Sequence, residues 1–376
     1  MKLKQFIQQE TVLTAAAVLA VVSAFFVPPD AQYLGYIDLR TLAILFSLMT
    51  VMAGLRRQGF FDGLGRVLLS RTHSTFQLTL VLVGLCFFGS MFITNDVSLL
   101  TFVPFTFVVL SRLGADVRRS LLIPVVCMQT IAANLGSMLT PIGNPQNLYL
   151  YGKSGMSIGG FVLLMLPYTL VSLLLLLAWA ALVCRKASAA LSVDELVSSS
   201  ASQGDQKIIL LYLVLFAVCL LSVIRVLPYG IAFAAVLVCV LFADPHTLRA
   251  VDYSLLLTFV AFFIFIGNLG RIPAFSGWLQ EFLTGREVLV AVLASQVTSN
   301  VPAALLLSGF TAETQALIIG TNLGGLGTLI ASMASLISYR QIARELPQGK
   351  KQYFGLFTLS NLIFLAILLS VWFLLR

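Results

Sequence analysis

Apolar stretches close to 20 residues long recur along the whole chain, and short polar segments separate them. Clear examples are residues 11–27, 161–183, 208–226 and 354–375. A helix of about 20 residues crosses a hydrocarbon core of roughly 30 Å. The pattern therefore predicts an all-α polytopic membrane protein. We expect the first stretch to stay in place as a span, because residues 27–30 make a poor signal-peptide cleavage site.

Weak matches in a constant order relate the two halves of the sequence. They predict an internal repeat, each copy reading as two spans, a re-entrant hairpin, a broken span and a final span. The matched positions are Arg57 with Arg271, Asn95 with Asn300, Asn134-Leu135-Gly136 with Asn322-Leu323-Gly324, and Thr140 with Thr328.

This interpretation gives about nine transmembrane helices, two re-entrant hairpins and two broken helices. Residues 1–183 form the first repeat, 184–226 a cytoplasmic linker with a connecting helix, and 227–376 the second repeat. An odd number of crossings precedes the second repeat, so the two repeats are expected in opposite orientations. With the N-terminus inside and the C-terminus outside, most Lys and Arg residues fall on the cytoplasmic side of an inner membrane.

Composition supports the membrane assignment, because 59% of the residues are apolar and only 10% are charged. The net charge is +8, and the basic residues that produce it are expected in short loops between spans. This distribution suits orientation in a lipid bilayer better than binding of nucleic acid. Arg56, Arg57 and Arg340 belong to these predicted cytoplasmic loops. The predicted core therefore contains no Lys or Arg.

Two polar segments interrupt apolar sequence and are predicted to be hairpin tips. They are residues 89–98, around Asn95, and residues 296–302, around Asn300. Non-helical backbone at membrane depth must line a cavity or be covered by protein. The spacing of Asn300 and Asn322 fits two arms of about ten residues, each reaching the midplane. In the first half, the extra length is expected in a basic loop near residues 111–120.

Residues 133–147 and 320–328 are rich in Gly, Asn and Thr, with two prolines in the first of them. Gly and Pro at this density break a helix, and the two half-helix ends suit anions and cations respectively. The alternative is an extramembrane loop.

Asp96 is the acidic residue that lies deep in an apolar segment. A charged Asp inside a membrane normally faces a cavity and marks an ion pathway. The alternative is that Asp96 caps the helix that follows the hairpin tip. If it binds the coupling cation, the ion is either a proton or sodium.

Enzyme chemistry is not expected, since no nucleophile–base set, metal-ligand spacing or phosphate loop stands out. A passive channel is the other alternative to a transporter.

The hairpin and helix-break motifs resemble those of the ion transporter superfamily, which includes arsenite permeases, citrate transporters and divalent-anion symporters. Gly143-Asn144-Pro145-Gln146-Asn147 is similar to a segment of bacterial generic anion permeases, and Thr94-Asn95-Asp96-Val97 and Ser299-Asn300-Val301-Pro302 resemble the two hairpin tips. The resemblance implies a homodimeric secondary transporter that moves a small inorganic or carboxylate anion by an elevator mechanism with a coupling cation. Arsenite or antimonite efflux and sodium/proton antiport are the alternatives.

Carried onto this sequence, the resemblance implies a site with a defined set of residues. No cofactor is implied beyond a bound sodium, expected near Asn95, Asp96 and Asn300 if sodium is the coupling ion. The implied site residues are Thr94, Asn95, Asp96, Asn134, Thr140, Gly143, Asn144, Ser299, Asn300, Thr321, Asn322 and Thr328.

Overall fold

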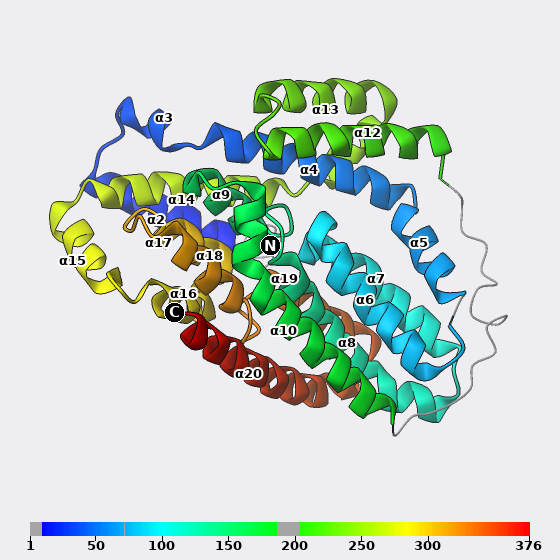
Figure 1. The fold of residues 1–376 in the computed structure, drawn as a ribbon. Coiled ribbons are helices and arrows are strands. Elements are labelled where there is room, and N and C mark those ends of the chain that lie inside the picture. The colour runs from blue at the N-terminus through cyan, green and yellow to red at the C-terminus, as the bar shows by residue number, and fades with distance from the viewer. Residues whose placement is uncertain (1–9, 71, 186–203) are drawn as a thin grey trace.

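The computed structural model describes residues 10–70, 72–185 and 204–376, and within them every regular element is a helix (Figure 1). Seven of these helices are long and apolar enough to cross a membrane, which confirms the predicted all-α polytopic class. They are α4 (Leu39–Arg57), α6 (Thr75–Ile93), α8 (Ala115–Ser137), α10 (Ile158–Cys184), α12 (Gln206–Val223), α14 (Tyr253–Gly270) and α20 (Lys350–Leu375), which η2 (Pro347–Gly349) precedes.

Shorter helices complete the described chain. The apolar ones are α2 (Thr11–Phe26), α7 (Asn95–Ser111), α13 (Tyr229–Ala243) and α16 (Glu287–Thr298). The others are α3 (Gln32–Tyr36), α5 (Phe60–Leu69), α9 (Pro145–Ser154), η1 (Pro245–Ala250), α15 (Pro273–Leu283), α17 (Asn300–Leu307), α18 (Thr314–Leu323) and α19 (Met333–Glu345). Most of the predicted polar linker, residues 186–203, lies outside the described residues.

The same local signals begin equivalent helices in the two halves. The Asp38 carboxylate accepts a hydrogen bond from the Thr41 amide at 3.0 Å, and the Asp252 carboxylate accepts one from the Leu255 amide at 2.9 Å. Each aspartate caps the first turn of its helix, α4 or α14. The helices after them then follow in the same order, from α5 to α10 and from α15 to α20.

The first hairpin differs from the second in the length of its arms. Helices α6 and α7 have 19 and 17 residues, whereas α16 and α17 have 12 and 8. The expected basic loop over 111–120 is wrong, because α8 already begins at Ala115. Gly114 provides its N-cap and Asp116 favours the positive end of the helix dipole, so the basic residues that follow join the helix.

Close packing divides the helices into two groups, and in Figure 1 helices α4, α12 and α13 of one group lie above α8 and α20 of the other. We call α2, α3, α4, α12, α13, α14 and η1 the scaffold group, and α6–α10 with α16–α20 the hairpin group. Closer packing between the groups comes from α4 with α9 and α14 with α17, besides the connecting helix α5. Helices α5 and α15 lead from the scaffold group to the two hairpins at opposite ends of the view.

Both halves of the sequence build the scaffold group, because their first helices are exchanged. Helix α2 precedes α4 in the chain but packs on α14, and α13 precedes α14 but packs on α4. An ion pair accompanies each exchange: Arg271 with Asp30 at 2.8 Å, and Arg57 with Asp244 at 3.0 Å. The matched arginines of the repeat therefore fix equivalent crossings.

Candidate functional site

Each hairpin turns at a residue with an unusual backbone. Thr94 has φ 67° and ψ 153°, and Ser299 has φ 75° and ψ 155°. A residue with a side chain pays of order 1–3 kcal/mol in this region, which glycine normally occupies, and surrounding contacts must hold it there. Such strain is typical of functional sites and marks the two tips as equivalent.

Backbone hydrogen bonds join each tip to the break in the neighbouring helix. The Asn95 amide donates to the Gly143 carbonyl at 3.2 Å, and the Asn300 amide donates to the Ala331 carbonyl at 3.0 Å. Gly143 is required for close approach, because a Cβ atom there would lie 2.1 Å from the Ser137 carbonyl oxygen. The breaks between α8 and α9 and between α18 and α19 thus satisfy the polar backbone of the tips.

Two threonines of the expected site fasten the tips through hydrogen bonds. The Thr140 hydroxyl donates to the Met91 carbonyl, and the Thr328 hydroxyl donates to the Gln296 carbonyl at 3.1 Å. Both acceptors lie in the last turn of the first hairpin arm. Thr328 is exposed and Thr140 is half-buried. Each side chain holds a hairpin arm through its hydrogen bond.

A buried asparagine joins the two halves at the first tip. The Asn95 side-chain amide donates to Asn134 Oδ1 at 3.0 Å, and the Ser332 hydroxyl donates to the same oxygen at 2.9 Å. The Asn134 amide in turn donates to the Ser335 hydroxyl at 3.3 Å. Ser332 and Ser335 belong to the second repeat, so Asn134 ties the first hairpin to the second helix break.

A second bridge between the halves runs through Asn322. Its amide donates to Asn147 Oδ1 at 2.6 Å, and its Oδ1 accepts from the Asn144 amide at 3.4 Å. The Asn144 amide also donates to the Ser137 hydroxyl at 2.7 Å. The helix breaks of the two repeats therefore lie against each other in the interior.

A cavity of about 250 Å³ lies between the two tips, the helix breaks and the first turns of α2 and α14. We call it the central cavity. Its wall includes five of the twelve expected site residues: Asn95, Asp96, Asn144, Ser299 and Asn300. Thr94 lines a neighbouring cavity, whereas six expected residues line neither cavity: Asn134, Thr140, Gly143, Thr321, Asn322 and the exposed Thr328.

Several wall residues were missed from the sequence. Gln146 is fully buried, Asp252 caps α14, and Arg340 lies in α19. Gln146 belongs to the 143–147 motif, and the sequence around Asp252 is typical of a helix N-cap. Neither local pattern indicates that the side chain lines a cavity. Arg340, expected in a cytoplasmic loop, instead lies in α19 and lines the cavity with an exposed side chain, while no Lys or Arg is among the buried residues of the described chain.

Buried polar atoms around the central cavity have no partner among the described residues. They are Asp96 Oδ1, Asn144 Oδ1, Gln146 Oε1 and Gln146 Nε2. A buried polar group without a hydrogen bond costs about 1–3 kcal/mol. These atoms therefore suit contact with a ligand that occupies the cavity.

Asp96 itself does not cap the helix that follows the tip. Within the described chain, no side chain accepts a capping hydrogen bond at the start of α7. The Asp96 amide instead donates to the side-chain oxygen of Asn95 at 2.9 Å. Asp96 thus lines the cavity without the capping hydrogen bond that the alternative interpretation expects.

Among the described residues, no group of three or more His, Cys, Asp or Glu side chains is placed to bind a transition metal. The oxygen-rich tips offer only the hard ligands that sodium prefers: side-chain amides, Asp96 and backbone carbonyls.

Comparison with known proteins agrees with this architecture. The profile of the family described as "Citrate transporter" matches residues 6–316. The inner membrane protein YbiR of Escherichia coli is 32% identical over 324 residues, which cover 84% of each chain. An uncharacterized transporter of Methanocaldococcus jannaschii is 31% identical over 304 residues, 81% of each chain. A silicon efflux transporter of Oryza sativa is 31% identical over 137 residues, which cover 36% of this chain and 27% of that protein.

The chain therefore belongs to the citrate transporter family, and it is a multi-pass membrane transporter.

Proposed function

We propose that this member of the citrate transporter family is a secondary active transporter of a small inorganic or carboxylate anion across the cytoplasmic membrane. The observation that carries the proposal is the position of the central cavity, whose surroundings include buried polar atoms with no partner in the described chain. The cavity lies where two hairpin tips and two helix breaks meet, and half-helix ends at such breaks bind ions.

Charge at the cavity favours coupling to a cation. Three acids, Glu10, Asp96 and Asp252, line it together with one base, Arg340. An anion that enters this wall meets more negative than positive charge, so a proton or sodium ion bound with it lowers the electrostatic cost. Asp96 is the proposed cation ligand, with Asn95 and Asn300 as neighbours if the ion is sodium.

The division into two helix groups suits an elevator movement. The hairpin group carries both tips and both helix breaks, and its closer packing on the scaffold group involves few helix pairs. We propose that the hairpin group moves past α4 and α14 while the scaffold group stays fixed in a homodimer. The N-terminus is placed inside and the C-terminus outside, as the distribution of basic residues indicates.

A second candidate function is efflux of an uncharged metalloid hydroxide such as arsenite or antimonite. Its support is that most of the buried atoms without a partner around the cavity are hydrogen-bond acceptors. Three are oxygens, on Asp96, Asn144 and Gln146, and one is the amide nitrogen of Gln146. A hydroxylated ligand supplies donors to these oxygens, whereas a fully ionised anion does not. The partial similarity to a silicon efflux transporter points the same way.

A ligand screen on purified protein separates these candidates. Thermal unfolding is followed with arsenite, sulfate, phosphate, citrate and succinate, each with and without sodium. A ligand that binds the folded state raises the midpoint, and at 100 times Kd it adds about 2.7 kcal/mol.

The screen is paired with a cavity variant and a matched control. Gln146→Leu should remove the shift given by the true ligand, while Gln315→Leu, on the exposed start of α18, should keep it. If no compound shifts the wild-type midpoint, or if Gln146→Leu responds as wild type does, the central cavity is not the substrate site.

A further inference from the structure

A second cavity of about 400 Å³ adjoins the central one. The two cavities share Asp96, Pro145, Asp252 and Leu255 in their walls. Arg56 and Arg57, at the end of α4, line only the second cavity. Arg56 and Arg57 therefore belong to the second cavity and not to the central one, and nothing in the proposed function uses them.

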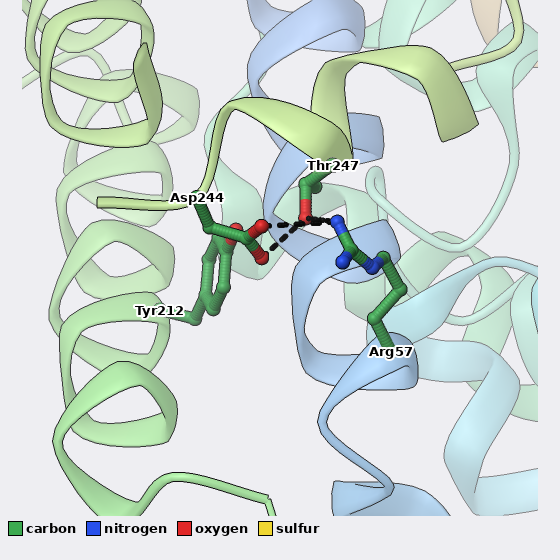
Figure 2. A network of polar contacts seen from close by, with 4 residues as sticks. All are labelled: Arg57, Tyr212, Asp244 and Thr247. Atoms are coloured by element: carbon green, nitrogen blue, oxygen red, sulfur yellow. Dashed lines mark hydrogen bonds and ion pairs between the residues drawn. The ribbon is translucent and has the colours of Figure 1, made fainter. Parts of the chain in front are cut away.

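Arg57 is held in place by the buried network in Figure 2. Its Nη1 atom donates to Asp244 Oδ1 at 3.0 Å and to the Thr247 hydroxyl at 3.1 Å. The other oxygen of Asp244 accepts from the Thr247 hydroxyl at 2.7 Å and from the Tyr212 hydroxyl at 3.1 Å. Since Asp244 is buried and fully engaged, Arg57 is a fixed cation at the cavity wall.

Both arginines keep donors for a ligand. In the described part of the chain, Arg57 makes its side-chain bonds through Nη1 alone. The side chain of Arg56 donates from Nη2 to the Leu100 carbonyl at 3.4 Å, a long contact. The remaining guanidinium N–H groups form the planar pattern that matches carboxylate, phosphate and sulfate oxygens.

The second repeat lacks this feature. Arg271, the counterpart of Arg57, pairs with Asp30 at 2.8 Å and donates to the Tyr36 hydroxyl at 3.2 Å on the surface. Glycine, Gly270, stands where the first repeat has Arg56. Arg57 and Arg271 thus form matching ion pairs in the two halves. The additional arginine beside a cavity, Arg56, occurs in the first half alone.

We propose that the Arg56–Arg57 cavity is a second anion subsite, on the path of the transported anion to the central cavity. Its ligand class is a small oxyanion. The role on the path rests on the proposed function, but binding of an anion there does not. Asp96 and Asp252 stand in the shared wall and repel an anion, so the arginines hold it until a cation neutralises those carboxylates.

Equilibrium binding of radiolabelled sulfate and of citrate to the purified full chain in lipid nanodiscs tests the subsite. The wild type should bind two equivalents per chain of at least one probe. Arg56→Gln, which leaves the Figure 2 network intact, should weaken one equivalent by about tenfold or more, the loss expected for a charge-assisted hydrogen bond. Gln146→Leu should remove the other equivalent.

Two further variants serve as controls. Arg271→Gln removes the matched arginine from the surface pair and should retain both equivalents. Arg56→Lys keeps the charge and should recover part of the affinity lost in Arg56→Gln. Thermal midpoints of all variants, measured without ligand, show whether a lost equivalent reflects unfolding.

Two results would overturn the subsite. One is a folded Arg56→Gln protein that binds both probes as the wild type does. The other is a single wild-type equivalent that disappears in Gln146→Leu and survives in Arg56→Gln. Two-site binding that depends on Arg56, in a protein that moves neither probe in proteoliposomes, supports the subsite and contradicts the proposed function, so the two failures are distinguishable.

Discussion

The two hairpins have nearly the same backbone and different charge. Thr94 and Ser299 turn at matching angles, and the next residue in each, Asn95 or Asn300, donates its amide to the adjacent helix break. One position later the first hairpin has Asp96 and the second has Val301. Matching backbone from the two halves thus forms the cavity, while the acidic side chain at this position belongs to the first hairpin alone.

Removing that charge should have the largest effect. Asp96→Asn is expected to reduce gradient-driven accumulation of substrate in proteoliposomes to the level of protein-free vesicles, because the coupling cation loses its ligand. Exchange of substrate across the membrane should persist. Asp116→Asn, the same change at the exposed start of α8, is the control and should accumulate substrate normally. Unaltered accumulation and ion dependence in Asp96→Asn would show that the charge difference between the hairpins has no role in coupling.

The contact between each hairpin and its broken helix offers a second comparison. A Cβ atom at Gly136 would lie 1.9 Å from the Phe87 carbonyl oxygen, whereas at Gly324 the nearest atoms are less close: the Ser295 hydroxyl at 2.7 Å and the Gly320 carbonyl oxygen at 2.8 Å. Gly136→Ala should therefore destabilise the protein by about 3 kcal/mol and Gly324→Ala by about 1, within the range for overpacking. Thermal unfolding in detergent measures both. Equal losses would mean that the second hairpin packs as rigidly as the first.

The threonine fastenings should give the smallest effects. Thr140→Val removes a half-buried hydroxyl that donates to Met91 and accepts from the Gly143 amide at 3.1 Å. It is expected to cost about 1 kcal/mol, the net value of a hydrogen bond. Thr328→Val should cost less, because Thr328 is exposed and water replaces its hydroxyl. Unfolding midpoints check the order, and if both variants transport at wild-type rates the threonines do not bind substrate.

Several features followed from the sequence alone, because they depend on local chemistry. Long apolar stretches specify membrane helices wherever they occur, as in α10 and α20. Asparagine-centred polar segments inside apolar sequence located both hairpin tips, and Gly and Pro located the first helix break. The order of these signals also predicted the repeat, and the matching positions Asp38 and Asp252 cap α4 and α14.

Only the tertiary structure decided which of these polar residues reach the cavity. Thr328 and Gln146 sit in equally suggestive motifs, yet one fastens a hairpin from the surface and the other is buried at the wall with no partner in the described chain. Arg340, Asp252 and Arg56 are far apart in the sequence, and the packing of α19, α14 and α4 brings them to the walls of two cavities that Asp96 also lines. Local signals fix where a helix begins or breaks, but the direction in which its side chains point depends on contacts between segments that lie hundreds of residues apart.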